Sequence, residues 1–146
     1  GSTTIALIQG VVFMCLAPLV VELSLSAIPL TLAVLGLVAF GLTGLGYTIA
    51  WSLDSTQGFH AIMNLFLIPL WLLSGAVFPP MGAPEWLQWI MVLNPLTYGV
   101  DAVRWSLYGS VQYAAMGRPE PLLSLAIVIA FAVATFLMSL YITKKR

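Results

Sequence analysis

The chain of 146 residues is 61% hydrophobic and only 7% charged, and its five basic and five acidic side chains give a formal net charge of zero. A soluble domain carries about a quarter charged residues, so this composition is typical of a membrane protein. The basic patch that a nucleic-acid partner requires is missing, and Cys15, the single cysteine, excludes an intrachain disulfide.

Four apolar segments are long enough to cross the hydrocarbon core of a bilayer, which takes about 20 helical residues. They occupy approximately residues 3–23, 28–53, 59–78 and 121–143. None of them shows the alternation of polar and apolar residues that a transmembrane β-barrel strand requires. The sequence therefore predicts an all-α membrane protein with about four transmembrane helices.

The segment between the last two of these spans is neither a span nor a simple loop. PEWLQWIMVL, residues 84–93, places its apolar side chains on one side of a short helix. Pro95 then interrupts the segment, because proline lacks an amide proton and disfavours helical geometry in the residue before it. We expect a second short helix at about 96–108. Three tryptophans suit the membrane interface: Trp86, Trp89 and Trp105.

Basic residues predict the orientation. Lys144, Lys145 and Arg146 favour a cytoplasmic C-terminus by the positive-inside tendency. With four spans, the N-terminus is then cytoplasmic as well. The short turn at 54–58 would lie inside, and the long segment at 79–120 outside.

Polar residues and glycines within the apolar spans are candidates for function. Gly41, Gly44 and Gly46 allow another helix to approach closely, and flexibility for gating is the alternative interpretation. Lipid cannot satisfy polar groups at membrane depth, so such groups tend to face protein or a water-filled path. The candidates to line a path are Gln9, Thr43, Tyr47 and Asn64.

Two polar pairs lie outside the spans. Asp101 and Arg104 are three residues apart, which places them on one helix face where they can pair. If this helix enters the membrane, pairing matters, because an unpaired charge there costs several kcal/mol. The alternative is an exposed ion pair at the lipid headgroups, which contributes about 0–1 kcal/mol to stability. Asp54 and Gln57 predict a capping-box-like start for the third span.

No enzymatic site is indicated. His60 and Cys15 have no acidic residue at a metal-ligand spacing, and His60 is interpreted as an interfacial polar residue. No GxxxxGK[ST] phosphate-binding loop occurs, so we expect no cofactor and no ATP hydrolysis by this chain itself.

Three stretches in this order resemble the C-terminal part of ABC-2-type transporter permeases: ALIQGVV (6–12), SLDSTQGFHAIMNLFLIPLWLLSGAVFPP (52–80) and PEWLQWIMVLNPLTYGVDAVRW (84–105). The closer resemblance is to the bacterial branch that includes drug-resistance and nodulation-factor exporters. It covers nearly all of residues 1–146 and implies spans three to six of a six-span domain. It also implies that the outer segment before the last span, about 83–108, is a pair of short re-entrant or interfacial helices. Since the sequence does not begin with Met, we expect a piece of a longer protein.

The resemblance implies a permease of an ABC exporter in the bacterial inner membrane. It would pair with a second permease subunit to form a homodimer, and cytoplasmic ABC ATPase subunits would drive it. The cargo would be a drug, a lipid or a lipid-linked or glycan substrate. The turn that the resemblance places against the ATPase comprises Asp54, Ser55, Thr56, Gln57, Gly58 and Phe59. The candidate outer gate comprises Asn94, Pro95, Tyr98, Asp101 and Arg104.

Two other functions remain open at this point. A non-transporting membrane scaffold or immunity protein could retain the same fold. An intramembrane enzyme would need paired catalytic polar residues at depth, and Gln9 and Asn64 are isolated from each other in the sequence.

Overall fold

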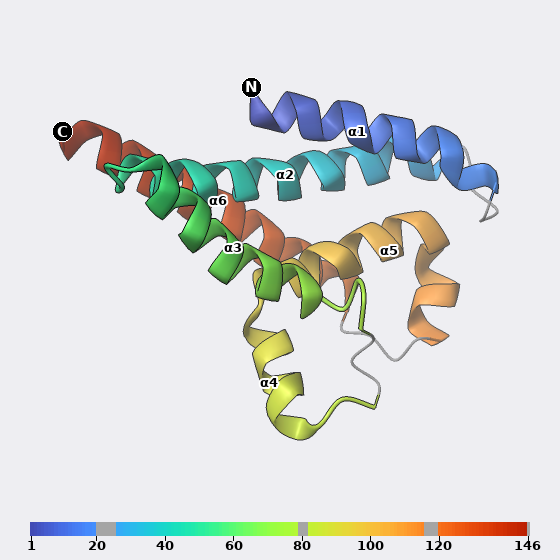
Figure 1. Ribbon diagram of the computed structural model, residues 1–146. Coiled ribbons are helices and arrows are strands. Elements are labelled where there is room, and N and C mark those ends of the chain that lie inside the picture. The colour runs from blue at the N-terminus through green and yellow to red at the C-terminus, as the bar shows by residue number, and fades with distance from the viewer. Residues whose placement is uncertain (20–25, 79–81, 116–119, 146) are drawn as a thin grey trace.

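The computed structural model describes residues 1–19, 26–78, 82–115 and 120–145, and the side chains of 110–115 are not among the described parts. These residues contain no strand and form the following helices: α1 (Ser2–Leu16), the short 3-10 helix η1 (Ala17–Leu19), α2 (Ala27–Trp51), α3 (Thr56–Leu72), α4 (Glu85–Leu93), α5 (Pro95–Ala115) and α6 (Pro121–Lys145). The predicted all-α fold is confirmed (Figure 1).

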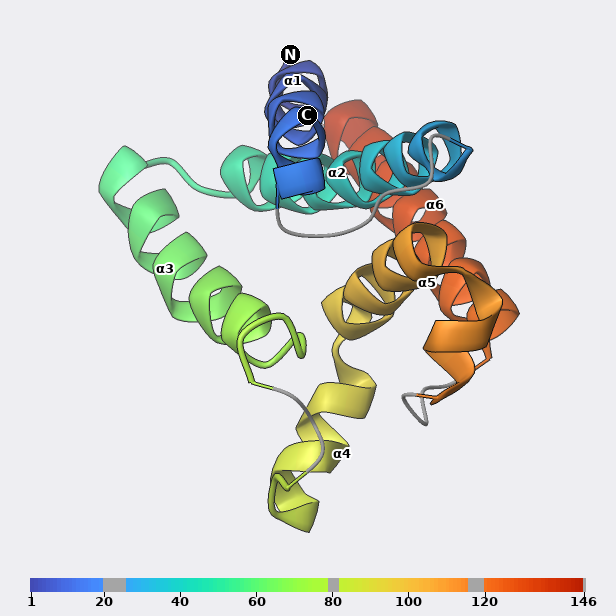
Figure 2. The ribbon, with the colours of Figure 1, turned by 90° about the vertical axis from the view of Figure 1, so that its right-hand side faces the viewer.

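Helix α2 is the centre of the bundle and packs against α1, α5 and α6. Close contacts pair Gly41 of α2 with Phe131 of α6 and, further along, Tyr47 with Thr143. The two helices therefore run in the same direction. Helix α3 makes little contact with α2, and Figure 2 shows α3 and α4 standing away from the rest of the bundle.

Two glycines bring α2 and α6 close together. A Cβ atom at Gly41 would lie 2.8 Å from Cδ1 of Phe131, and one at Gly44 would lie 2.9 Å from Oγ1 of Thr135. A Cβ atom at such distances would force a neighbouring group to shift, so the predicted close helix approach is confirmed at both positions. A Cβ atom at Gly46 would meet a methionine of α3 at an ordinary 3.6 Å, so Gly46 is not needed for contact with α6.

Small polar residues fill much of the remaining bundle interior. Thr31 of α2 is fully buried, and its hydroxyl lies 2.9 Å from the hydroxyl of Ser106 on α5. Ser124 and Thr135 of α6 are buried as well. Short side chains let the helix backbones approach, and hydroxyls can bond to carbonyl groups of their own helix.

Three helical stretches are long and apolar enough to span a membrane: Ser2–Leu19, Ala27–Trp51 and Pro121–Lys145. The expected span at 59–78 is shorter than predicted, because α3 ends at Leu72 and a turn follows with Gly75 at a positive φ of 80°. Its 17 residues lie at the lower limit of about 17 for a membrane span. The count of four spans thus stays a prediction, and the end of the first, at 20–23, lies outside the described residues.

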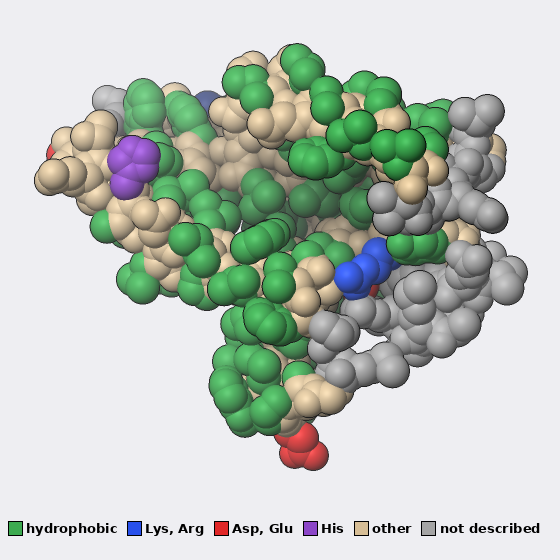
Figure 3. Space-filling view, turned by 45° about the vertical axis from the view of Figure 1, so that its right-hand side comes forward, with side chains coloured by type: hydrophobic (Ala, Val, Ile, Leu, Met, Phe, Trp, Pro, Cys, Tyr) green, Lys and Arg blue, Asp and Glu red, His purple; other side chains and the backbone are tan. Residues whose placement is uncertain are grey.

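The surface of the bundle is mostly hydrophobic. On the face in Figure 3, hydrophobic side chains predominate and charged ones are few. Phe13, Leu65 and Leu122 are each more than half exposed, as are Trp86 and Trp89 on α4. Large apolar side chains in such number are suited to contact with lipid rather than water. The chain is a multi-pass membrane protein.

Candidate functional site

Of the five candidate gate residues, Asn94 and Pro95 lie at the junction of α4 and α5, and Tyr98, Asp101 and Arg104 follow along α5. Asn94 follows α4 and directly precedes α5, and its Oδ1 accepts a hydrogen bond of 2.9 Å from the amide of Leu96. Pro95 is the first residue of α5, where a helix needs no amide donor. The predicted break into two short helices is confirmed. The expected end of the second near 108 also agrees with the structure, since Gly109 has non-helical backbone angles.

Two side chains join this junction to the end of α3. Nδ2 of Asn94 donates a hydrogen bond of 2.6 Å to the carbonyl of Leu70, and Nη2 of Arg104 donates one of 2.8 Å to the carbonyl of Gly75. Carbonyl groups in the last turn of a helix and just after it lack partners within the helix, so they are available to such donors. Asn94 is 4% exposed, which places its hydrogen bonds in the interior.

Two further side chains hold α4 against α5. The hydroxyl of Thr97 donates to the carbonyl of Met91 at 2.7 Å, and that of Tyr98 donates to the carbonyl of Val92 at 2.9 Å. Thr97 also lies 3.5 Å from the carbonyl of Leu73. Sequence reasoning missed Thr97; its position three residues after the helix break at Asn94 was the available signal. Helix α4 and the first part of α5 together span residues 85–108, and we call this unit the hairpin.

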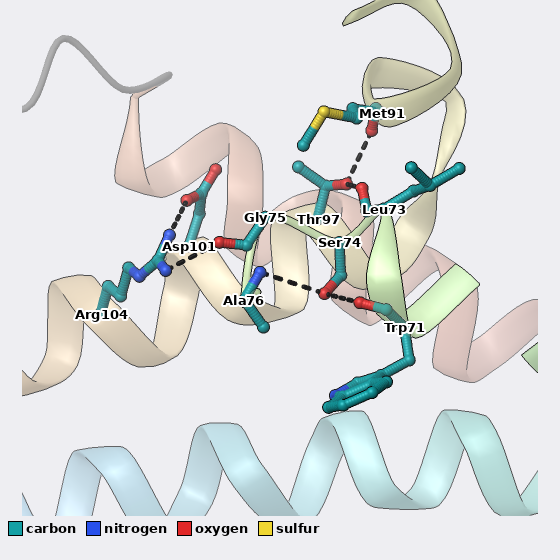
Figure 4. Close-up of polar contacts among 9 residues, drawn as sticks. All are labelled: Trp71, Leu73, Ser74, Gly75, Ala76, Met91, Thr97, Asp101 and Arg104. Atoms are coloured by element: carbon teal, nitrogen blue, oxygen red, sulfur yellow. Dashed lines mark hydrogen bonds and ion pairs between the residues drawn. The ribbon is translucent and has the colours of Figure 1, made fainter. Parts of the chain in front are cut away.

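The turn after α3 has its own internal support (Figure 4). Ser74 is 1% exposed, and its hydroxyl donates to the carbonyl of Trp71 at 2.6 Å while accepting from the amide of Ala76 at 3.3 Å. This arrangement presents the Gly75 carbonyl to Arg104. The backbone carbonyl of Gly75, between Ser74 and Ala76, is thus the acceptor for the guanidinium of Arg104.

Asp101 and Arg104 form the expected pair on one face of α5, with Nη1 of Arg104 4.0 Å from Oδ1 of Asp101. The side chain of Asp101 is 1% exposed and that of Arg104 25%. This burial argues against the alternative of an exposed pair at the headgroups. Arg104 therefore has two tasks: it neutralises a buried carboxylate and binds the turn after α3.

The turn at 54–59 begins α3, but with a different cap from the predicted one. Ser55 is the N-cap: its backbone is extended, and its Oγ accepts a hydrogen bond of 3.0 Å from the amide of Gly58. The expected cap at Asp54 is wrong by one residue, because α3 starts at Thr56 and the cap is the residue directly before it. The polar side chains of the turn, from Asp54 to Gln57, are exposed.

An open groove of about 660 Å³ lies between α1, α2 and α3. Thr43 and Tyr47 line it, whereas Gln9 and Asn64 are exposed and are not among its lining residues. The structure thus brings together two of the four path-lining candidates. Most of the groove is apolar, with lining side chains that include Leu35, Val38, Leu42, Phe59, Met63 and Leu67.

The two path-lining candidates in the groove, Thr43 and Tyr47, each have a hydroxyl partner on another helix. Oγ1 of Thr3 on α1 donates to Oγ1 of Thr43 at 3.1 Å, and the hydroxyl of Tyr47 lies 3.2 Å from that of Thr143. The ring of Tyr47 stacks on Trp51 at 5.5 Å between ring centres. The groove therefore offers an apolar surface with a few anchored hydroxyl groups. The described residues contain no cluster of three or more potential metal ligands.

Comparison with known proteins gives relatives over the same region. Residues 1–108 match the sequence family described as ABC-2 type transporter. The chain is 28% identical to Nodulation protein J of Sinorhizobium fredii over 97% of its own length and 52% of that protein. It is 34% identical over 53% of its length to the ycf38 protein of Pyropia yezoensis, and 30% identical over 70% to that of Porphyra purpurea, both named as transport permeases.

The chain spans about half the length of Nodulation protein J and covers 26% and 36% of the two ycf38 proteins. No solved structure matches it. The geometry of the hairpin and groove described above is therefore the structural basis for interpreting its function.

Proposed function

The chain belongs to the ABC-2 type transporter family, and we propose that it is part of the permease of an ATP-driven exporter. Cytoplasmic ABC ATPase subunits would supply the energy, and a second permease subunit, in the simplest case a copy of the same protein, would complete the path. The cargo is a drug, a lipid or a lipid-linked or glycan substrate. The membrane is the bacterial inner membrane, with both ends of this chain on the cytoplasmic side.

The hairpin is the observation that carries the proposal. It combines buried polar residues with helices too short to cross a bilayer, since α4 has 9 residues and Gly109 interrupts α5. Its polarity is compensated by the Asp101–Arg104 pair and by the bonds of Asn94. Such a unit suits a gate at the outer end of a path, where it would seal the path against water without crossing the membrane.

The turn at 54–59 is proposed to contact the ATPase. Its polar side chains are exposed, and the Ser55 cap gives it a defined backbone. Phe59 extends from this turn into the groove between α1, α2 and α3. The groove, with its hydroxyls at Thr43 and Tyr47, is suited to an amphipathic cargo: apolar walls bind the apolar part, and few fixed polar groups allow different cargoes to bind.

Site-specific photo-crosslinking tests the ATPase contact in the full-length permease, expressed with its ATPase subunit. A photoreactive amino acid replaces Gln57, which is exposed in the turn, and the matched control replaces Gln88, which is exposed on α4. We expect an adduct with the ATPase from position 57 and none from position 88. An adduct from position 88 alone would reverse the proposed orientation.

The alternative is a membrane scaffold or immunity protein that retains this fold without transporting anything. It predicts that the full-length protein, reconstituted into proteoliposomes with any ATPase encoded beside it, leaves ATP hydrolysis unchanged. The exporter predicts a complex whose ATP hydrolysis rises with its cargo. Drug, glycan and nodulation genes beside the parent gene each indicate which cargo to assay.

A further inference from the structure

We propose that the ends of α2 and α6 form a binding site for the phosphate-bearing headgroup of an anionic membrane lipid, with Lys145 as its cationic residue. A pocket of about 330 Å³ lies there, lined by Trp51 and Ser52 at the end of α2 and by Ile142 and Lys145 of α6. The inference concerns the membrane around the chain, so it holds for an exporter and for a scaffold alike.

The pocket lies at the depth of the lipid headgroups. Helices α2 and α6 have 25 residues each, which at about 1.5 Å per residue makes a length of about 37 Å. The hydrocarbon core of a bilayer is about 30 Å thick, and the bilayer with its headgroup regions about 40–45 Å. Both helices run in the same direction, and α6 ends near the end of α2 (Figure 1). Their last turns therefore reach the layer that contains the lipid phosphates.

Contacts between and within the two helices hold the pocket in shape. The hydroxyl of Tyr47 lies 3.2 Å from that of Thr143, which joins α2 to α6 about one turn before their ends. The ring of Tyr47 stacks on Trp51 at 5.5 Å between ring centres. The hydroxyl of Ser52 donates to the carbonyl of Thr48 at 2.8 Å. The residues of the pocket are thus positioned by groups of this chain itself.

The charges at this end of the bundle suit an anion. Lys144 and Lys145 lie in the last turn of α6, and neither forms an ion pair with an acidic side chain of the described residues. Asp54, two residues after Ser52, is the acidic residue nearest to the pocket in the sequence, and the two lysines outnumber it. Basic residues directly beside a membrane span attract anionic lipids, and here one of them also lines a pocket.

The apolar wall of the pocket favours a lipid over a soluble anion. Trp51 and Ile142 line the pocket together with Lys145. Tryptophan is enriched at the membrane–water interface, where its ring lies at the level of the headgroups. The ammonium group of a lysine binds a phosphate as a point charge, while the apolar wall can receive the glycerol backbone and the first methylene groups of the acyl chains. A free phosphate would use the lysine alone and leave the apolar wall exposed.

Native mass spectrometry of the full-length protein tests the site, because it counts the lipids that stay bound after release from detergent micelles. The protein is incubated with an equal mixture of phosphatidylglycerol, which is anionic, and phosphatidylcholine, which carries a phosphate but no net charge. The unchanged protein is compared with Lys145→Gln, Lys145→Arg and Lys144→Gln. Lys144→Gln is the matched control, because it removes the same charge from the neighbouring residue, which does not line the pocket.

We expect the unchanged protein to retain phosphatidylglycerol in preference to phosphatidylcholine. Lys145→Gln should weaken the retention of phosphatidylglycerol about fivefold, the factor that corresponds to about 1 kcal/mol for one basic residue near an anionic surface. Lys145→Arg should retain the lipid as the unchanged protein does, because the charge is kept. Lys144→Gln should have a clearly smaller effect than Lys145→Gln, because its side chain lies outside the pocket.

Equal losses in Lys144→Gln and Lys145→Gln would refute the site, since they would indicate a diffuse attraction to the basic end of α6. Equal retention of the two lipids by the unchanged protein would refute it as well, and would mean that another part of the full-length protein covers the pocket or that no anion binds there. Release of phosphatidylglycerol by an excess of inorganic phosphate would assign the pocket to a soluble anion instead. None of these outcomes depends on ATP hydrolysis, so the proposed export is tested separately.

Discussion

Replacing Gly44 with alanine would place a methyl group against α6. The new Cβ would lie 2.9 Å from Oγ1, 3.1 Å from Cβ and 3.3 Å from the carbonyl carbon of Thr135. Non-bonded carbon atoms pack best at about 3.5–4.0 Å, and the helix fixes the Cβ and the carbonyl carbon of Thr135, so a change of its side-chain rotamer cannot relieve these contacts. Helices α2 and α6 must therefore move apart by several tenths of an ångström.

The expected net effect is the difference of two terms. Overpacking of this kind costs about 1–3 kcal/mol, whereas alanine in place of glycine regains about 1 kcal/mol of helix propensity. We expect Gly44→Ala to lower the free energy of unfolding by about 1 kcal/mol. At Gly46 the new Cβ would lie 3.6 Å from the flexible Cε of Met63, so Gly46→Ala keeps the propensity gain and should raise that free energy by up to about 1 kcal/mol.

Titration with sodium dodecyl sulfate in mixed micelles, followed by circular dichroism, measures both variants against the parent. Adding Thr135→Ala to Gly44→Ala removes the nearest atom and should recover part of the loss, which a double-mutant cycle quantifies. Shifts of the same sign and size for the two glycine variants would refute the reasoning. They would mean that propensity alone decides the effect and that the α2–α6 contact is looser than the structure has it.

Three further predictions concern polar groups. Asp101→Asn and Arg104→Gln should each lower the yield of folded protein and any export more than the double substitution does. Breaking a buried pair costs about 3–5 kcal/mol, and the cost is smaller here because the arginine is partly exposed. Equal losses in all three variants would show that the two side chains are not coupled. Ser55→Ala should speed hydrogen exchange of the Gly58 amide, with a loss of about 1 kcal/mol, while Ser55→Asp should not; equal exchange in both would exclude the cap. Thr31→Val should lower the free energy of unfolding by about 1 kcal/mol. Ser124→Ala should not lower it, because the hydroxyl of Ser124 has no partner among the described protein atoms. The same denaturant titration checks both variants, and a larger loss for Ser124→Ala than for Thr31→Val would contradict the prediction.

The sequence by itself determined the class of the protein and most of its helices. Long apolar runs predict helices in any membrane, because the backbone must satisfy its own hydrogen bonds there. Pro95 marks the break in the hairpin, since proline's missing donor is a local property, and Gly41 and Gly44 predict close helix contact, since the lack of a side chain is local too. The pairing of Asp101 with Arg104 follows from the period of one helix.

Local patterns were less successful at helix ends. The predicted third span continued to residue 78 because LLSGAVF remains apolar, although Gly75 adopts the positive φ that commonly ends a helix. The cap of α3 was placed at Asp54 instead of Ser55 because both residue types can cap, and only the start of the helix distinguishes them. The two errors, of one residue at the start of α3 and of six at its end, arise because a local pattern does not fix where a helix begins or ends.

Only the tertiary structure decided which distant groups meet. Asn94 and Arg104 bind carbonyls 24 and 29 residues away in the sequence. Every residue carries a carbonyl, so no residue type marks the acceptor in advance; the fold selects it by placing the end of α3 beside the start of α5. For the same reason Thr43 and Tyr47 line the groove while Gln9 and Asn64 do not. The sequence shows that a side chain is polar, but the packing of the neighbouring helices determines whether it faces a groove.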